Sequence, residues 1–121
     1  MSADCVFCRI VRGDAPATFV GAWIDTLAIV PLNPVTEGHI LVIPRAHVTD
    51  ALAAPEVTAR VTARAAHLAR RPCNIITSCG AEATQTVFHL HVHIVPRREG
   101  DGLPLPWTPQ RKALADDRLR A

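Results

Sequence analysis

The sequence predicts an α+β protein in which an antiparallel sheet of five strands carries one main helix. Segments with strand and helix periodicity follow one another in the order strand, strand, strand, helix, strand, strand, which favours this class over alternating βαβ units. The chain has 121 residues, of which 49% are hydrophobic, so a single domain is long enough to bury a core without disulfides.

The first three strands are expected before residue 45. Thr18–Trp23 and Leu27–Val30 read as two strands of a hairpin joined near Asp25. Two prolines interrupt the pattern over residues 31–34. The apolar run His39–Ile43 then predicts a third strand, buried on both faces and ended by Pro44.

A helix and two further strands are expected next. Pro55 suits a helix start, and apolar residues recur at helical spacing up to about Arg71, at Val57, Val61, Ala65 and Leu68. Strands are expected at Cys73–Ser78 and Thr86–Val95, with a loop over residues 80–84. Glycine and proline beyond Arg98 predict a tail over residues 99–121, with a short helix from about Thr108 to Arg120.

Composition argues against several functions. The formal charge of +2 comes from scattered arginines, so binding to nucleic acid or to a membrane surface is not expected. No apolar run is long enough to span a bilayer, and the N-terminus lacks the pattern of a signal peptide. We therefore expect a soluble cytoplasmic protein.

The cysteines form two groups. Cys5 and Cys8 make a C-x-x-C pair, which is typical of half a zinc site or of a redox pair. A tetrahedral zinc site would need two more ligands, and histidines are available. Cys73 and Cys79 have no ligand-spaced neighbour and are expected to be buried small residues.

Three histidines at alternate positions, His89, His91 and His93, are the most informative feature of the chain. On a strand they would line one face roughly 7 Å apart, while the apolar residues between them face the core, namely Phe88, Leu90, Val92 and Ile94. Histidine titrates near neutral pH, so the row offers a nucleophile, a proton donor or metal ligands.

The row alone leaves three interpretations. The histidines are a zinc ligand set with an open catalytic position, as in a zinc-dependent hydrolase. Alternatively, one histidine attacks phosphorus while its neighbours bind phosphate oxygens. The third interpretation is a polar strand face without chemistry.

At this point the residues resemble the histidine triad (HIT) superfamily of nucleotide hydrolases and transferases. The segment His89–Val95 matches the motif His-φ-His-φ-His-φ-φ, with φ apolar, at every position. Gly38–His47 and Cys5–Ile10 resemble two further blocks of the family, the second being the N-terminus of its small bacterial zinc-containing members. The resemblance implies a single HIT domain over residues 1–121, with a core of 1–98 and a tail of 99–121, paired into a homodimer across a two-fold axis.

The resemblance also implies site residues. His91 would attack the α-phosphorus of a purine nucleotide, either a nucleoside phosphoramidate or a dinucleoside polyphosphate, and form a nucleotidyl-histidine that water hydrolyses. The residues implied for phosphate and nucleotide binding are His93, His39, Gln85, Thr86, Ser78 and Asn33. Apolar contacts from Phe7, Ile10 and Leu32 would help to hold the nucleoside. The implied zinc ligands are Cys5, Cys8, His47 and His89, and this zinc would be structural.

Three positions depart from the family pattern, one of them Ser78, which stands in place of an amide. Pro31 stands where members commonly carry the Asp or Asn that binds ribose, with Asn33 as a substitute nearby. Thr84 stands in place of a glycine next to the phosphate site. These departures keep open a nucleotide-binding regulatory protein with little turnover, beside the enzyme.

Overall fold

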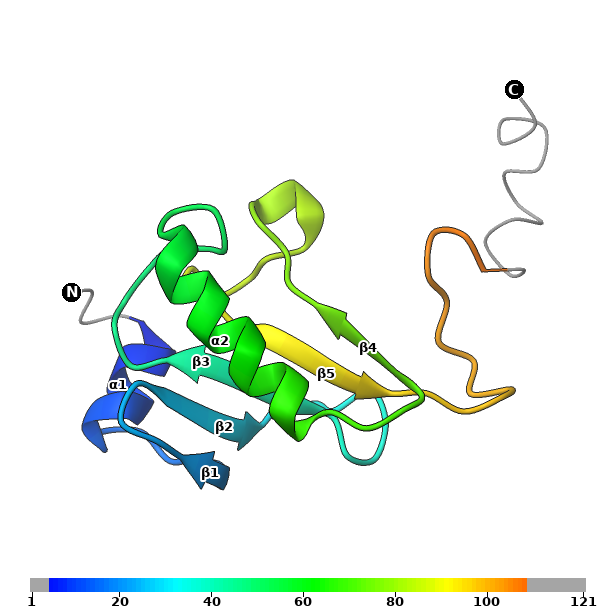
Figure 1. Cartoon of the computed structure of the whole chain (residues 1–121), viewed down its shortest axis with the longest axis horizontal. Helices are drawn as coiled ribbons and strands as arrows, with labels where there is room; N and C mark the ends of the chain where they lie inside the picture. The colour runs from blue at the N-terminus through cyan, green and yellow to red at the C-terminus, as the bar shows by residue number, and fades with distance from the viewer. Residues whose placement is uncertain (1–4, 109–121) are drawn as a thin grey trace.

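The computed structural model describes residues 5–108 and forms a five-stranded antiparallel sheet in the order β1-β2-β3-β5-β4 (Figure 1). The predicted α+β class and antiparallel sheet are confirmed. The elements are α1 (Val6–Arg12), β1 (Thr18–Ala22), β2 (Thr26–Val30), β3 (Ile40–Pro44), α2 (Pro55–Leu68), β4 (Cys73–Ile76), the 3-10 turn η1 (Ala81–Ala83) and β5 (Val92–Pro96).

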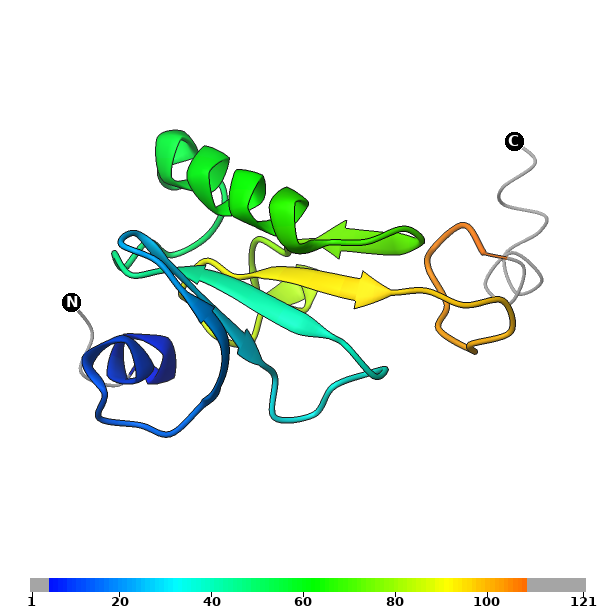
Figure 2. The same cartoon turned by 60° about the horizontal axis from the view of Figure 1, so that its bottom comes forward.

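The two α-helices cover opposite faces of the sheet (Figure 2). On one face, Val61 and Ala65 of α2 pack over Val42 and Val92. On the other face, α1 packs over β2 and β3 through the buried residues Phe7, Cys8, Ile10, Leu27, Ile29, Leu41 and Ile43. The third strand is therefore central and buried on both sides, as its apolar sequence predicts.

Helix α1 was not predicted, although its end signal is present in the sequence. Its first turn is capped by the Cys5 thiol, which accepts a hydrogen bond from the main-chain N–H of Cys8 at 3.4 Å. Gly13 ends the helix in the left-handed conformation, with φ of 83°, and donates to the carbonyl of Ile10. Seven residues are too few for helix periodicity to be visible, and too few for an isolated helix to be stable.

The last strand begins at Val92, so the predicted start at Thr86 is wrong. The chain bends over residues 87–89. There the His89 carbonyl accepts from the His91 side chain, and the N–H of Leu90 donates to Val48 outside the sheet at 2.7 Å. Because of this bend Phe88 is 48% exposed rather than in the core, whereas Leu90, Val92 and Ile94 are buried as predicted.

Smaller differences from the prediction concern the ends of other helices and strands and the burial of two cysteines. Helix α2 stops at Leu68 because Ala69 is extended, shortly before the residues restricted by Pro72. Strand β4 ends at Ile76, and the next side chain, Thr77, donates to the His91 carbonyl at 2.8 Å. Strand β3 extends through Pro44. Cys73 and Cys79 are half-buried rather than buried, and the helix predicted beyond Thr108 lies outside the described residues.

The start of the tail is fastened to the sheet by Arg97. Its guanidinium donates to both carboxylate oxygens of Asp101 at 2.8 and 3.0 Å and to the Asn74 side chain at 2.6 Å. The Arg97 hydrogen bonds hold the pKa of Asp101 well below its usual range. These bonds hold the start of the tail beside the first residues of β4 and the last residues of β5. Within residues 5–108, no helix has the length and apolar character needed to cross a membrane.

Candidate active site and zinc centre

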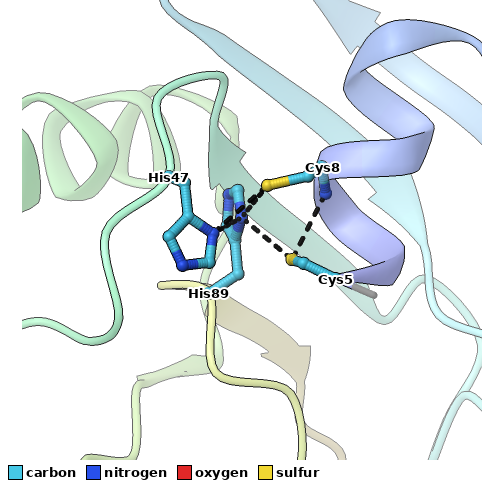
Figure 3. Close-up of side chains that lie close together, drawn as sticks. All are labelled: Cys5, Cys8, His47 and His89. Carbon is cyan, nitrogen blue, oxygen red and sulfur yellow. Dashed lines mark hydrogen bonds between the residues drawn. The ribbon is translucent and has the colours of Figure 1, made fainter. Parts of the chain in front are cut away.

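Four side chains from three segments converge beside α1. Cys5 caps the helix and Cys8 lies in its first turn, while His47 follows β3 and His89 lies in the bend before β5. Their ligand atoms all lie within 4.8 Å of one another (Figure 3). The Nδ1 atoms of His47 and His89 are 3.2 Å apart, and the Cys8 sulfur is 3.2 Å from His47.

These residues fit a tetrahedral zinc ion. Zinc bonds of about 2.0–2.3 Å give ligand–ligand edges of about 3.3–3.8 Å, close to the separations found here. The Nε2–H of His89 donates to the Pro44 carbonyl at 2.9 Å, so the lone pair is on Nδ1 and faces the thiols. Two thiols and two imidazoles are also a preferred zinc set. The predicted zinc site is confirmed, and with four protein ligands it is a closed, structural site.

Burial favours the neutral form of two of the ligands, His89 and Cys8, when no metal is bound. It lowers the pKa of the His89 imidazole and raises the pKa of the Cys8 thiol, which the neighbouring Cys5 raises further. A neutral imidazole is already the metal-binding form. A bound Zn²⁺ would instead favour the deprotonated form of the cysteines, because the metal stabilises the thiolate strongly.

His91 is half-buried beside this centre and is held as one tautomer. Its Nδ1–H donates to the main-chain carbonyl of His89 at 2.8 Å, so its Nε2 carries the lone pair. The edge of Phe7 packs against the imidazole, with ring centroids 5.2 Å apart. The centroid of the His93 ring is also 5.2 Å from that of His91. An oriented imidazole with a free lone pair is suited to act as a nucleophile.

His93 and His39 form a second imidazole pair. Strand pairing of His93 with Leu41 and Ile76 places its side chain on the face of the sheet that α1 covers. The Nδ1 of His93 lies 2.9 Å from the Nε2 of His39. Burial, and then the neighbouring His91 and His39, lower the pKa of His93 to about 4; burial also lowers that of His39. Both rings are therefore neutral at physiological pH.

A cavity of about 350 Å³ opens in front of this pair. It brings together three predicted site residues, His39, His93 and Ser78, and also includes Thr84. Much of the remaining wall is apolar and includes residues that no motif indicated, among them Val35, Ile76, Leu103, Pro104 and Leu105. Only the folding of the tail brings the last three to the site.

The other predicted nucleotide-binding residues lie elsewhere. The Gln85 amide is occupied by the main chain: its oxygen accepts from Gly80 at 2.8 Å and its nitrogen donates to Thr49 at 2.8 Å. It therefore fastens the loop before the triad. Thr86 and Asn33 are exposed and do not line this cavity. Of the apolar residues expected near the nucleoside, Phe7 and Ile10 are buried between α1 and the sheet, whereas Leu32 is 94% exposed.

Thr84 adopts a backbone conformation that favours glycine. Its φ is +74°, and among residues 5–108 no other non-glycine residue has a positive φ. This conformation is strained for a β-branched side chain, because its Cβ crowds the main chain. The replacement of glycine by Thr84, noted in the sequence, therefore occurs at a position where the backbone conformation favours glycine.

The three histidines of the row do not form one ligand set. In the described part of the chain, the metal-binding group contains His89 but neither His91 nor His93. The bend before β5 turns the first imidazole toward the thiols. The third, His93, lines the cavity, and His91 lies next to His93 with ring centroids 5.2 Å apart. The geometry therefore does not support a zinc-dependent hydrolase that uses the row as its ligands.

The fold and this site define the class of histidine-triad hydrolases, and the comparisons agree. A crystal structure of a zinc-bound histidine triad family protein from Mycobacterium smegmatis is 38% identical, with a TM-score of 0.79 and coverage of 98% of both chains. A HIT family hydrolase from Clostridium thermocellum is 28% identical, with a TM-score of 0.73 and coverage of 87% of this chain and 100% of that one. Adenylylsulfatase HINT3 of Arabidopsis thaliana is 33% identical, over 95% of this chain and 63% of the relative.

The chain belongs to the HIT family, whose HIT domain matches residues 12–100. Membership implies a nucleotide ligand.

Proposed function

We propose that the protein cleaves a purine nucleotide at its α-phosphate through a covalent nucleotidyl-histidine on His91. The substrate would be a nucleoside phosphoramidate or a dinucleoside polyphosphate. The observation that carries the proposal is the orientation of His91. Because its Nδ1–H is bonded to the His89 carbonyl, its Nε2 lone pair is free to attack phosphorus.

The reaction would take place in two displacements. In the first, Nε2 of His91 forms a bond to the α-phosphorus, and the bond to the leaving group breaks; the leaving amine or phosphate takes up a proton from solvent. In the second, water forms a bond to the same phosphorus and releases a proton to solvent, the P–Nε2 bond breaks, the nucleoside monophosphate departs, and His91 returns to its neutral form. The carbonyl of His89 stabilises the positive imidazole of the intermediate through the Nδ1–H bond.

The surroundings supply donors rather than further bases. His93 is neutral and lines the cavity together with Ser78, which supports a role for both in binding phosphate or leaving-group oxygens. The apolar wall of the cavity would accept an apolar part of the leaving group. Phe7, which packs against the His91 ring, would limit access of water on the side of α1.

AMP release from defined substrates tests the proposal. Adenosine phosphoramidate and diadenosine tetraphosphate are the first substrates, and adenosine 5′-phosphosulfate is added because of the name of the Arabidopsis relative. The wild-type protein should release AMP from at least one of them. His91→Ala should abolish release, whereas the matched control His67→Ala, on the exposed side of α2, should not. Intact-protein mass spectrometry after a rapid quench should detect the nucleotidyl adduct only with His91 present.

A nucleotide-binding protein with little turnover is the second candidate, and the strained Thr84 beside the cavity favours it. A Cβ at this position narrows the approach to phosphate. AMP binding detected by calorimetry, without release from any of the three substrates, would select this function.

We also propose a homodimer. Strand β4 is at the edge of the sheet, and its Ile75 is 42% exposed. An apolar residue on an unpaired edge favours pairing with a second copy.

A further inference from the structure

A main-chain donor fixes the protonation of His39. The N–H of Val35 donates a hydrogen bond to Nδ1 of His39 at 3.1 Å. A peptide N–H is always a donor, so Nδ1 of His39 must carry a lone pair. His39 is only 5% exposed and neutral, and therefore its single ring proton is on Nε2.

The consequence passes to the next ring. Nε2 of His39 lies 2.9 Å from Nδ1 of His93, and because the first nitrogen carries the proton, the second must accept it. His93 is neutral as well, so its own ring proton is on Nε2. That nitrogen remains available to a ligand in the cavity that His93 lines.

His91 and His93 therefore have opposite tautomers. The His89 carbonyl places the ring proton of His91 on Nδ1 and its lone pair on Nε2. At His93 the Nδ1 atom instead accepts the Nε2–H of His39, so the ring proton of His93 is on Nε2 and its lone pair is on Nδ1. Two neighbouring rings, 5.2 Å apart, thus offer one lone pair and one N–H. A displacement at phosphorus needs this combination, a nucleophile and a donor to a phosphate oxygen.

We propose that His39 is a positioning residue, which together with the Val35 N–H holds His93 as a neutral Nε2–H donor toward the reacting phosphate. His39 acts through His93. The part that concerns phosphate rests on the proposed function, whereas the tautomer of His93 does not. Arg97, which lines the same cavity, is already bonded to Asp101 and Asn74 and is not an alternative donor of the same kind.

Nitrogen NMR of the full chain with zinc tests the tautomer directly. The nitrogen shifts of neutral His93 should show the proton on Nε2 in the wild type. His39→Gln should keep it there, since a side-chain amide accepts from Val35 and donates to His93. His39→Glu has the same shape but only accepts, so it should move the His93 proton to Nδ1. The proposal fails if the wild type has the Nδ1–H tautomer, or if the Gln and Glu variants have the same one.

Two further variants keep the test decisive if the Glu variant does not fold. Val35→Pro removes the main-chain N–H and leaves both imidazoles in place, and Val35→Ala is its matched control. The alanine variant should keep the single His93 tautomer, and the proline variant should give a mixture. In His39→Leu, which fills the space without a donor, the tautomer should also be mixed. A single wild-type tautomer in both the Pro and Leu variants would overturn the proposal.

Activity provides the second readout. With the substrate that the wild type turns over, His39→Gln should stay within about tenfold of the wild-type kcat, and His39→Glu should lose about 100-fold or more. Equal losses in both variants would show that His39 only fills space. Because the NMR readout needs no turnover, a wild type without activity would reject the proposed function and leave the tautomer result standing.

Discussion

The carbonyl of His89 accepts the Nδ1–H of His91 at 2.8 Å, while the imidazole of the same His89 belongs to the zinc centre. One residue therefore joins the metal site to the proposed nucleophile through its own main chain. A zinc ion held by four protein ligands would have no open position for a substrate. It would hold His89 in place, and with it the carbonyl that orients the His91 imidazole.

Loss of one thiol should remove the metal and destabilise the fold. Cys5→Ser should lose bound zinc, measured by atomic absorption, and unfold at a lower temperature. When free zinc exceeds the dissociation constant a thousandfold, the lost stabilisation is about 4 kcal/mol. Cys73→Ser, in β4 and outside the cluster, is the matched control and should keep both zinc and stability. Equal metal content in the two variants would refute the assigned ligand set.

Thr84→Gly should stabilise the protein. The strain of a non-glycine residue at φ of +74° costs about 1–2 kcal/mol, and the added freedom of glycine in the unfolded chain offsets about 0.4–1 kcal/mol of the gain. We expect a net increase of about 0.5–1 kcal/mol in the free energy of unfolding, measured with urea. Ala83→Gly, one residue earlier and without a positive φ, should instead destabilise. A destabilised Thr84→Gly would mean that its side chain makes a contact worth more than the strain.

Acid should destabilise the protein partly through His93. Its pKa is lowered from 6.5 to about 4 in the fold, so between these pH values the unfolded chain binds more protons. Stability is therefore fully present above pH 6.5 and falls as the pH decreases toward 4. After a discount for partial exposure the effect is about 1–2 kcal/mol. His93→Gln should flatten the pH dependence of the unfolding free energy in this window, and an unchanged slope would contradict the shift.

The tail should detach when its ion pair is broken. Asp101→Asn removes the carboxylate that accepts two bonds from Arg97, so residues 99–105 should exchange amide hydrogens faster and be cleaved earlier by a protease. Leu103–Leu105 line the cavity, and KM for the preferred substrate should change with them. Glu99→Gln, an exposed change in the same segment, is the control. Equal exchange rates in both variants would show that Arg97 does not hold the tail.

The proposed homodimer predicts a mass change upon substitution at the sheet edge. Ile75→Arg places a charge on β4 and should lower the mass measured by light scattering from that of two chains toward one. Ile24→Arg, at a 96% exposed position between β1 and β2, should leave it unchanged. A wild-type protein with the mass of a single chain would refute the dimer outright.

Local patterns predicted most of the sheet but not the details near the site. The apolar run at residues 39–43 and the helical spacing after Pro55 placed β3 and α2 correctly, because burial on two faces and on one stripe leaves a clear periodicity. The bend before β5 left no such signal. At this bend His89 contacts Cys5, which is 84 positions away in the sequence, and no local pattern records such a contact.

The candidate site, too, could be predicted only in part from the sequence. Resemblance to the family indicated the four zinc ligands, and these do lie together. It did not reveal that the Gln85 amide is occupied by the main chain, or that Val35 sets the tautomer of His39. Main-chain donors and acceptors are the same for every sequence, so only their position in the fold shows which side chains they control.

The span between Cys5 and His89 also bears on the order of events during synthesis. The residues of α1 leave the ribosome before those of the sheet, but its seven residues are too few to form a stable helix alone. The partners that hold it, His47 and then His89, follow at about 5–20 residues per second, so the centre is completed only after most of the chain has emerged. The helix that packs against the proposed nucleophile is thus made before the residues that hold it and is set in place only after them.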